Sequence, residues 1–320
     1  MKIKNITWIM LLLIFAACSK NSANPEFVTE TTDTPTSAIN ERLAEQTGLK
    51  HFIYHVGPVD LPAHTNLTDA LENPLVMSFH VDQPLWIIGF KPKVIDASGE
   101  ELPSDLLFHA IVSNEHEENP LCETDAVANP FVVANSTLTE IAFPKGYGYA
   151  VLSTDSLIAE VVLYNTSNIS YIDVSFELDV VAKEMNEYAG LKDVKPLLLD
   201  VDPCTHQPLQ IQPEEFTERQ ISFPVPAPGN LLIGQGIMQR FASFIELFKN
   251  SDPTSFWRAE AYLDENHYIE ELIGNPFEDP AGVEFKEDDE LTLKVGYENT
   301  SGNWYKGASA AAMVYFAIDN

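Results

Sequence analysis

Basic residues are scarce in this 320-residue chain. Lys and Arg total 18 against 48 Asp and Glu, which gives a formal net charge of −30 at pH 7. Binding of nucleic acid through its phosphates needs clustered Lys and Arg, and so does docking on an anionic bilayer through a polybasic patch. The composition argues against both partners. It does not indicate disorder, because 45% of the residues are hydrophobic and 10% are aromatic.

Long hydrophobic runs are also missing, with one exception at the N-terminus. Residues 6–17 (ITWIMLLLIFAA) form an apolar run after Lys2 and Lys4. The run is shorter than the roughly 20 residues that a membrane-spanning helix needs, and it is typical of an export signal. It ends in Phe15-Ala16-Ala17-Cys18, which resembles the lipobox of bacterial lipoproteins.

The lipobox resemblance implies that residues 1–17 are removed as a signal peptide. Cys18 would then be acylated, become the first residue of the mature chain and anchor it in a lipid bilayer. The alternative is an ordinary cleaved signal peptide with an incidental cysteine. Loss of Lys2 and Lys4 would leave 16 bases against 48 acids, so the mature net charge would be −32.

The residues after Cys18 predict where the anchored protein lies. Residues 18–50 are rich in Ser and Thr and poor in aromatics, so we expect a flexible tether there. Ser19 and Lys20 supply no acidic signal for export to another membrane face. The expected location is the bacterial cell envelope, on the periplasmic face of an outer membrane.

Cysteine is rare as well, with only three in the chain. Cys122 and Cys204 remain besides the proposed acylated Cys18. Two cysteines exported to an oxidising compartment usually pair. The sequence therefore predicts a disulfide between Cys122 and Cys204.

Strand signals dominate from residue 51 onward. Short runs rich in β-branched and aromatic residues are separated by turns that contain Pro and Gly. Between Ile172 and Val180, apolar residues alternate with Asp173, Ser175, Glu177 and Asp179. This period of two predicts one buried and one solvated face, with the acids in water.

The strand pattern is interrupted once. Residues 183–194 (KEMNEYAGLKDV) read as a linker or a short surface helix, and strand-rich runs resume at residues 197–201, include one run at 230–248, and continue to residues 310–318. Regularly spaced short strands without long helical periods predict sandwiches. The expected fold class is all-β, with two tandem antiparallel β-sandwiches at residues 51–192 and 193–320.

Common catalytic motifs are absent. The chain has no P-loop, GxGxxG, HExxH or GxSxG sequence. Several Asn-X-Ser/Thr sequences occur, among them the four that begin at Asn66, Asn135, Asn165 and Asn168. Because the signal sequence is bacterial in type, these four are attributed to chance.

Several stretches, taken in order, resemble the copper type II, ascorbate-dependent monooxygenases, of which the peptidylglycine α-hydroxylating monooxygenase is one. They are residues 54–64 (YHVGPVDLPAH), 94–114, 146–149 with 161–165 (VVLYN), 195–201 (KPLLLDV), and a C-terminal group at 257–262, 290–299 and 304–305. The resemblance implies two jelly-roll-like sandwiches. It also implies one copper per domain, facing a solvent-filled cleft between them.

The ligands of the first copper site are largely absent. The family has a His-His pair where this chain has Phe108-His109, and a third His where it has Tyr164. Phe108 cannot coordinate a metal, so His109 is a vestige of the site rather than one of a working set.

The ligands of the second copper site are absent too. The family's His-X-His corresponds to Ile237-Met238-Gln239, and its Met falls near Ala308, with Met313 a few residues away in what reads as a buried strand. Ile237 cannot bind copper, and an amide such as that of Gln239 is a poor ligand for Cu(I). No His-His, His-X-His or Cys-X-X-Cys sequence occurs anywhere in the chain.

These observations favour a membrane-anchored envelope protein that has kept the fold and lost the chemistry, with no cofactor. It would be a binding or structural relative of the monooxygenases, with an unidentified ligand or envelope protein as partner. The cleft would be lined by six residues: Phe108, His109, Tyr164, Ile237, Met238 and Gln239. Two alternatives remain: a copper-binding ascorbate-dependent monooxygenase, and a structural subunit of an envelope complex.

The remaining polar clusters have plainer interpretations. His51 and His55 would share one face of a strand about 13 Å apart, too far to bind one ion. His116, in residues 115–118 (EHEE), and the acidic run 287–290 (EDDE) could bind a divalent ion. Solvated turns are the favoured interpretation of both.

Overall fold

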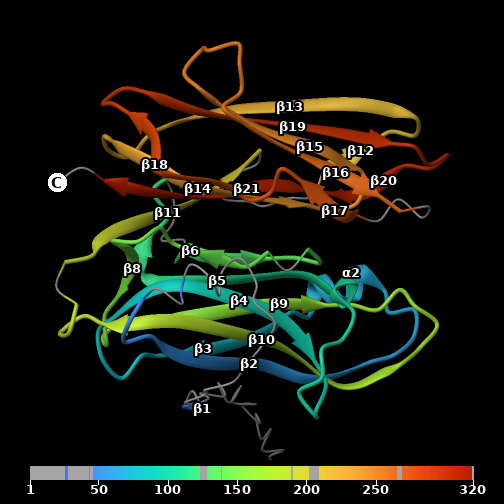
Figure 1. The fold of residues 1–320 in the computed structure, drawn as a ribbon. Helices are drawn as coiled ribbons and strands as arrows, with labels where there is room; N and C mark the ends of the chain where they lie inside the picture. The colour runs from blue at the N-terminus through green and yellow to red at the C-terminus, as the bar shows by residue number, and fades with distance from the viewer. Residues whose placement is uncertain are drawn as a thin grey trace, which may run out of the picture.

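The computed structural model describes residues 26–27, 43, 46–122, 128–137, 139–188, 190–201, 209–264 and 269–318. Their regular structure is almost entirely β-strand, arranged as two sandwiches, one above the other (Figure 1). The helix α2 (Leu67–Glu72) and the 3-10 turn η1 (Ser104–Leu106) are short. Within the described residues, no helix has the length and apolarity to cross a membrane. The prediction of an all-β fold is confirmed.

The first unit, residues 46–188, is a jelly roll. One sheet has the order β2-β10-β4-β8, with the two-residue strand β7 also paired to β4; the other has the order β3-β9-β5-β6. The first sheet contains β2 (Lys50–Leu61), β4 (Leu85–Ile95), β7 (Ile141–Ala142), β8 (Tyr147–Val151) and β10 (Tyr171–Glu184). The second contains β3 (Leu75–Phe79), β5 (Leu107–Glu118), β6 (Ala128–Ala134) and β9 (Leu157–Leu163).

The second unit, residues 190–318, repeats this topology. One sheet has the order β11-β21-β14-β18 and the other β13-β19-β15-β16-β17. The first contains β11 (Lys192–Asp200), β14 (Gly229–Met238), β18 (Phe277–Phe285) and β21 (Ala310–Ile318). The second contains β13 (Glu215–Pro224), β15 (Ala242–Lys249), β16 (Trp257–Leu263), β17 (Ile269–Ile273) and β19 (Glu290–Asn299). A two-stranded ribbon pairs β12 (Leu209–Ile211) with β20 (Tyr305–Ala308).

The two units share the connectivity that defines the jelly roll. Each unit has eight main strands, which exclude β7 in the first unit and β12, β17 and β20 in the second. Numbered along the chain within each unit, these strands have the order first-eighth-third-sixth in one sheet and second-seventh-fourth-fifth in the other. The jelly-roll architecture is thus present twice. The run at residues 230–248, which reads as continuous in the sequence, is in fact two strands, β14 and β15. They lie in different sheets and are separated by a turn in which Phe241 has φ = +68°.

The units are joined through their sheets. Strand β11 begins beside β8 in the first unit, where Lys192 and Asp193 pair in parallel with Tyr147 and Gly148. From Val194 onward, β11 pairs with β21 of the second unit. The expected boundary at residue 192 therefore falls on the first residue of a strand that connects the two units. One ten-stranded sheet runs through both.

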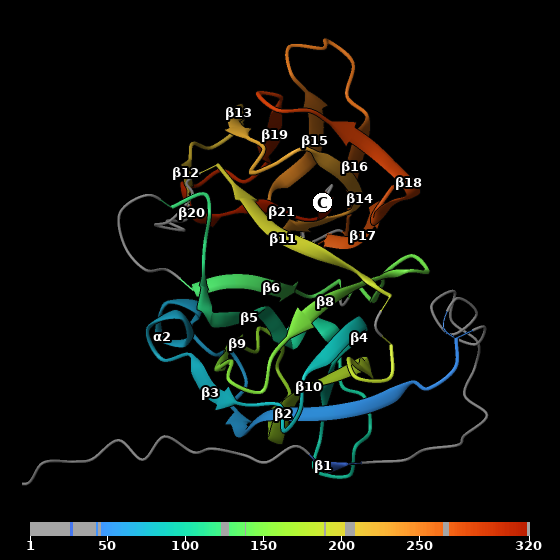
Figure 2. The ribbon, with the colours of Figure 1, turned by 90° about the vertical axis from the view of Figure 1, so that its left-hand side faces the viewer.

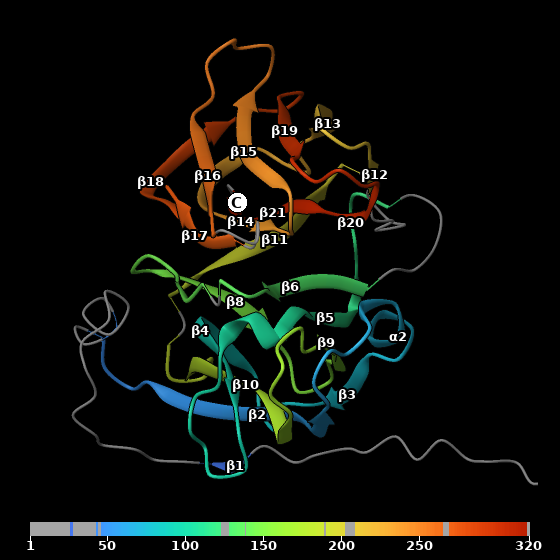
Figure 3. The ribbon, with the colours of Figure 1, turned by 90° about the vertical axis from the view of Figure 1, so that its right-hand side faces the viewer.

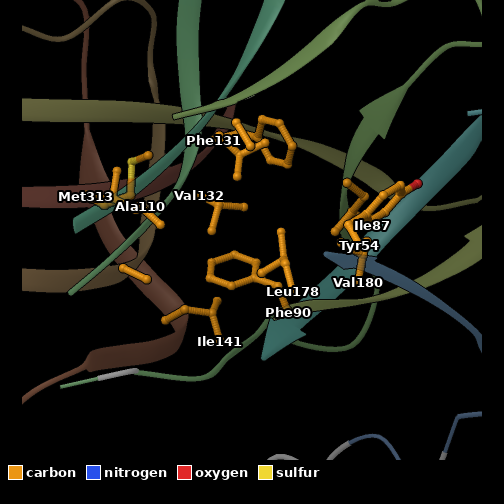
Figure 4. Packing of buried hydrophobic residues seen from close by; sticks show 14 of the residues in the cluster. Tyr54, Ile87, Phe90, Ala110, Phe131, Val132, Ile141, Leu178, Val180 and Met313 are labelled. Carbon is orange, nitrogen blue, oxygen red and sulfur yellow. The ribbon is translucent and has the colours of Figure 1, made fainter. Parts of the chain in front are cut away.

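The sheet of β11, β21 and β14 lies across the upper edge of the first unit. In views along the strands, the two sheets of the first unit stand side by side with β6 and β8 uppermost, beneath β11 (Figures 2 and 3). Side chains of β21 extend into the end of the sandwich that faces this sheet. Figure 4 shows Met313 of β21 in the same cluster as Phe90, Ala110 and Val132 of the first unit.

Strand β21 therefore has two buried faces. Successive side chains of a strand point to opposite faces. Ala311, Met313, Tyr315 and Ala317 belong to the core of the first unit. The alternate residues, Ala310, Ala312, Val314 and Phe316, belong to the core of the second unit. This explains why the strand is continuously apolar (AAAMVYFAI), as expected for a strand that meets water on neither face.

Hydrogen bonds add to this shared core. The buried Tyr315 hydroxyl donates to the carbonyl oxygen of Phe131 at 2.9 Å. Burial raises the pKa of Tyr315 well above its ordinary value, so the phenol stays protonated and remains a donor. Tyr315 also packs against Phe143, with ring centroids 5.0 Å apart. The junction is therefore apolar, and the hydrogen bond and ring contact of Tyr315 fix how the two units are oriented there.

The segment expected to be a tether contacts the first unit at several places. Strand β1 (Glu26–Phe27) pairs with β2 at Ile53 and Phe52. Leu43 is 4% exposed and packs in a small cluster with Ile88, Ala142 and Val181. Residues 46–50 lead into β2, and the Tyr188 hydroxyl donates to the Thr47 carbonyl oxygen at 3.0 Å. Cys18, the signal peptide and the other residues of the expected tether lie outside the described residues.

The alternating strand at residues 172–180 is β10, and its buried face is largely as predicted. Val174, Phe176, Leu178 and Val180 are buried, whereas Ile172 is 70% exposed because it lies near the strand end, before the register shift between Tyr171 and Val174.

On the opposite face of β10, two of the acids are paired with basic side chains rather than simply solvated, contrary to the expectation from the sequence. Both Asp179 carboxylate oxygens lie 3.0 Å from His51 Nδ1, and Asp179 is only 9% exposed. Glu177 lies 2.9 Å from His55 Nε2 and 3.7 Å from Lys93 Nζ. Each histidine thus contacts a carboxylate of its own, and part of the negative charge is paired across strands.

One buried side chain at the junction supports a prediction. Gln235 of β14 pairs in register with Met313, is 1% exposed, and neither polar atom of its amide has a hydrogen-bond partner within the described residues. An unsatisfied buried polar group costs about 1–3 kcal/mol. We expect Gln235→Met to raise the free energy of unfolding by about 1 kcal/mol, measured by denaturant titration.

Asn135 is the matched control, because it is also 1% exposed but its Nδ2 donates to the Met238 carbonyl oxygen at 2.9 Å. Asn135→Leu should lower the free energy of unfolding. A loss of stability in Gln235→Met as large as that in Asn135→Leu would contradict this account of the junction.

Candidate functional site

A pocket opens between the two units at one end of the molecule. It is a shallow pocket with a cavity volume of about 40 Å³, and the rest of the space between its lining residues is open to solvent. The first unit contributes Asp105, Leu107, Phe108, Ser136 and Tyr164. The second unit contributes Met238, Gln239, Arg240, Ile269 and Tyr305. We call this the junction pocket.

The junction pocket is built from equivalent segments of the two jelly rolls. Asp105 and Gln239-Arg240 each lie in the connection between the third and fourth main strands of their unit. Tyr164 and Tyr305 each lie after the seventh main strand. Their residues line one pocket, so these connections meet across the junction. Helix α2 of the first unit and β20 of the second also lie on the same side of the molecule (Figures 2 and 3).

The first unit's side of the pocket is held by the start of β5 and the end of β9. The pairing of these strands shifts register between Leu107 and His109. The Tyr164 amide donates to the Leu106 carbonyl oxygen at 2.9 Å, which draws the two strand ends together. The Phe108 and Tyr164 rings meet edge to face with centroids 5.7 Å apart. Two aromatic rings thus form one wall.

The loop after Tyr164 is fixed by Asn165, which is fully buried. Its Oδ1 accepts the Ser167 amide at 3.0 Å, and its Nδ2 donates to the Ile169 carbonyl oxygen at 2.6 Å. Asn299, Ser301 and Asn303 repeat this arrangement in the second unit, at 3.0 and 2.9 Å. The Asn-X-Ser sequences at Asn165 and Asn299 thus stabilise turns that precede Ile169 and Tyr305.

The second unit's side follows directly from the end of β14. The Gln239 backbone N–H donates to the Ser309 carbonyl oxygen at 2.9 Å. The side-chain Nε2 of Gln239 donates to the Phe108 carbonyl oxygen at 2.7 Å. Together with the bond from Asn135 to Met238, this fixes the two units against each other at the pocket floor. The side-chain nitrogen of Gln239 is therefore already hydrogen-bonded to the protein backbone.

Arg240 and Asp105 give the pocket its charges. They are the one cationic and the one anionic side chain among its lining residues. The Arg240 guanidinium carbon lies 4.8 Å from the Phe241 ring centroid and 6.0 Å from that of Tyr305. Phe241 and Tyr305 pack edge to face at 4.9 Å. These cation–π contacts hold the guanidinium beside the two rings.

The structure brings four of the six predicted cleft residues together: Phe108, Tyr164, Met238 and Gln239. His109 and Ile237 do not line the pocket, so the prediction is wrong for them. Ile237 is 6% exposed in the shared core, because its position on β14 points it between the sheets. His109 points to Glu160 instead, with 4.0 Å between Nε2 and Oε1.

The residues that sequence reasoning missed are Asp105, Leu107, Ser136, Arg240, Ile269 and Tyr305. Most lie at strand ends or in connections, where period-two patterns carry no information. A sequence signal was nevertheless present: Asn-Thr-Ser occurs at both 165–167 and 299–301, each after the seventh main strand. Aligning the units on this repeat would have placed Tyr305 in the loop equivalent to the one that begins at Tyr164.

Metal ligands are not assembled in the part of the chain that the structure describes. No group of three or more His, Cys, Asp or Glu side chains there could hold a metal ion. The EHEE segment is not the expected solvated turn, because it forms the end of strand β5, where His116 Nδ1 accepts the Ser156 amide of the neighbouring turn at 3.0 Å. In the acidic run 287–290, hydrogen bonds from the Lys286 amide and Asn250 lower the pKa of Asp289 to about 2, again within a turn.

Comparison with known proteins adds little. No family model and no curated protein matches the chain. Among solved structures, STIV MCP is 10% identical with a TM-score of 0.38, over 83% of this chain and 97% of that one. PBCV-1 VP54, fitted into a reconstruction of the virophage Sputnik, is 8% identical (TM-score 0.33; 86% and 98%). The Macrobrachium rosenbergii nodavirus is 10% identical (TM-score 0.21; 91% and 97%). With TM-scores below 0.5, none of the three carries an argument about this chain.

Cys122 is disulfide-bonded, and Cys204 lies outside the described residues, so its identity as the partner stays a prediction. We expect the folded, exported protein to resist alkylation at both cysteines until it is reduced. After reduction, mass spectrometry should detect two alkyl groups, on Cys122 and Cys204. Alkylation of Cys204 in the unreduced, folded protein would contradict the pairing.

Proposed function

We propose that this protein is a lipid-anchored component of the bacterial cell envelope, facing the periplasm from an outer membrane. Its fused jelly rolls would bind a small ligand at the junction pocket without catalysing a reaction. The observation that carries the proposal is the filled junction. Apolar side chains from both units occupy the space between them, and the pocket at one end is lined by Phe108, Tyr164, Met238 and Gln239.

The anchor is supported by the sequence around Cys18 and agrees with the place of β1. Strand β1 pairs with β2 at the edge of the first unit that lies farthest from the second unit (Figures 1 and 2). Glu26 lies eight positions after Cys18, a reach of at most about 28 Å at ~3.5 Å per residue. The first unit would therefore lie nearest the bilayer and the second unit would extend away from it.

The proposed absence of catalysis is supported by the side chains at the positions where the monooxygenase resemblance places copper ligands, because most of them have no free atom that could bind copper. Phe108 and Ile237 offer no donor atom, and the Gln239 amide nitrogen is bonded to a backbone carbonyl. Met313 is fully buried beside Gln235. These residues do not fit a pair of copper sites. We infer that the chain is a relative of those monooxygenases in which apolar packing has replaced both metals.

A binding role is supported by the composition of the junction pocket. Ligand sites are concave and mostly apolar, with a few convergent polar groups that orient the ligand. Here, aromatic and aliphatic side chains form the walls, and Asp105, Ser136, Gln239 and Arg240 supply the polar groups. The two units also meet through a broad apolar contact, which holds the pocket walls in place.

Acylation can be tested at one residue. We expect cells expressing the full chain to incorporate labelled palmitate into the protein, which should fractionate with membranes. Cys18→Ala should remove the label and the membrane association. Cys122→Ala is the control, because it removes a cysteine of the body and should keep the label. Equal labelling of wild type and Cys18→Ala would disprove the anchor.

Copper binding tests the proposed loss of chemistry. Purified mature protein, incubated with Cu(I) or Cu(II) and then dialysed against a competing chelator, should retain far less than one copper per chain. His109→Ala should retain the same small amount, because His109 would act alone. One or two tightly held coppers per wild-type chain, lost in His109→Ala, would restore the monooxygenase alternative.

A further inference from the structure

Most edges of the sheets carry residues that oppose the pairing of a further strand. An edge strand presents unpaired N–H and C=O groups, and proteins guard such edges with charged residues, with Pro or by keeping the strand very short. Among the described edge strands of five residues or more, four contain such residues: Pro58 in β2, Glu218 and Arg219 in β13, Glu270 and Glu271 in β17, and Pro280 in β18. A fifth, β6, lies beneath β11 (Figures 2 and 3).

Strand β3 is the exception. Its sequence, LVMSF, contains neither a charged residue nor Pro. It pairs with β9 on one side, and no described strand pairs with it on the other. It forms the edge of its sheet opposite β6, so the second unit does not cover it (Figures 2 and 3). Val76, in the middle of the strand, is 55% exposed. The described part of the chain therefore leaves this edge open and unguarded.

The edge is also held in place by the core of the first unit. Leu75, Met77 and Phe79 point inward and pack against that core. The Phe79 ring lies 4.2 Å from the ring of Tyr54 on β2, measured between centroids. Val76 alternates with these residues and lies on the outer face. An edge that is already ordered loses little conformational freedom when a partner strand adds to it.

The charge of the chain favours an uncharged contact between copies. Two chains with a net charge of −30 repel each other, but β3 brings no charge to the contact. A two-fold axis at Met77 would place Leu75 opposite Phe79 of the second copy and Val76 opposite Ser78 of the second copy. No acid then faces an acid. Such a contact is self-complementary, because each strand supplies the N–H and C=O groups that the other lacks.

We propose that β3 pairs antiparallel with β3 of a second copy, which joins their two four-stranded sheets across a two-fold axis. Five residues span only about 17 Å at ~3.4 Å per residue. The contact is therefore smaller than a standard protein interface, and the dimer is weak, with a dissociation constant in the high micromolar range. This dimer does not depend on ligand binding at the junction pocket.

Sedimentation equilibrium of the mature chain tests the dimer. The chain carries Cys18→Ser, which removes the proposed acylation site. We expect a monomer–dimer equilibrium that tightens several-fold when NaCl is raised from about 0.05 M to about 0.5 M, because salt screens the repulsion between the two acidic chains. Val76→Lys should weaken the dimer at least tenfold, because it places a charge at the open edge.

Ile273→Lys is the matched control. Ile273 is also 55% exposed and also lies on an edge strand, β17, but in the second unit. Its replacement should leave the dimer unchanged. Ser78→Lys is a second variant at the proposed contact, and circular dichroism shows which variants are folded.

Cross-linking tests the register. Val76→Cys and Ser78→Cys chains, mixed under a mild oxidant, should form a disulfide-linked dimer several-fold faster than either variant alone. The reason is that Val76 of one copy lies opposite Ser78 of the other, where the Cβ atoms of paired residues are about 4.5–5.5 Å apart.

Three results would overturn the proposal. The first is a monomer at both salt concentrations up to ~1 mM chain. The second is a dimer that the folded lysine variants of β3 leave unchanged, or that Ile273→Lys weakens equally. The third is cross-linking that is no faster in the mixture than in either cysteine variant alone, which would exclude the two-fold antiparallel register.

Discussion

The burial of both faces of β21 is the constraint on which the rest of the structure depends. A strand that is apolar on every residue must be covered on two sides. Its Met313 face completes the core of the first unit, and its Val314 face lies in the core of the second. Neither unit keeps its core covered without the other. Separation of the units would expose Met313 and Tyr315 to water, and burying each such side chain is worth about 1.5–3 kcal/mol.

The position of the pocket follows from this closure. Apolar side chains fill the middle of the junction, and the junction pocket lies where strands end and connections begin. The two jelly rolls share one topology and present equivalent connections at the same end, so the lining residues come in corresponding pairs, such as Tyr164 and Tyr305. Two residues at positions where the proposed monooxygenase resemblance would place copper ligands have different roles: Ile237 lies in the core and Phe108 in the pocket wall.

Periodicity predicted the elements well and their partners poorly. The alternation from Val174 to Val180 identified β10 and its buried face, because the period of a strand is a local property. The exposed acids were misjudged at Asp179, because its pairing with His51 depends on a strand 128 residues away. The break between β14 and β15 was missed because the turn at Phe241 contains neither Gly nor Pro. The candidate site was found through Phe108, Tyr164, Met238 and Gln239, whereas Arg240 and Asp105 lie in connections whose meeting depends on how the units pack.

Equilibrium unfolding of two variants, each with a single tryptophan in one of the two units, tests the shared core most directly. Trp86 reports on the first unit and Trp257 on the second, and Trp8 lies in the proposed signal peptide, which the mature protein would lack. Two variants of the mature protein are needed, each with Trp304 replaced by Phe and with either Trp86 or Trp257 also replaced. The shared core predicts that fluorescence in both variants changes at the denaturant midpoint given by circular dichroism of the same variant. Two separated midpoints in the circular dichroism trace, each matched by only one tryptophan, would contradict it and leave two independent jelly rolls.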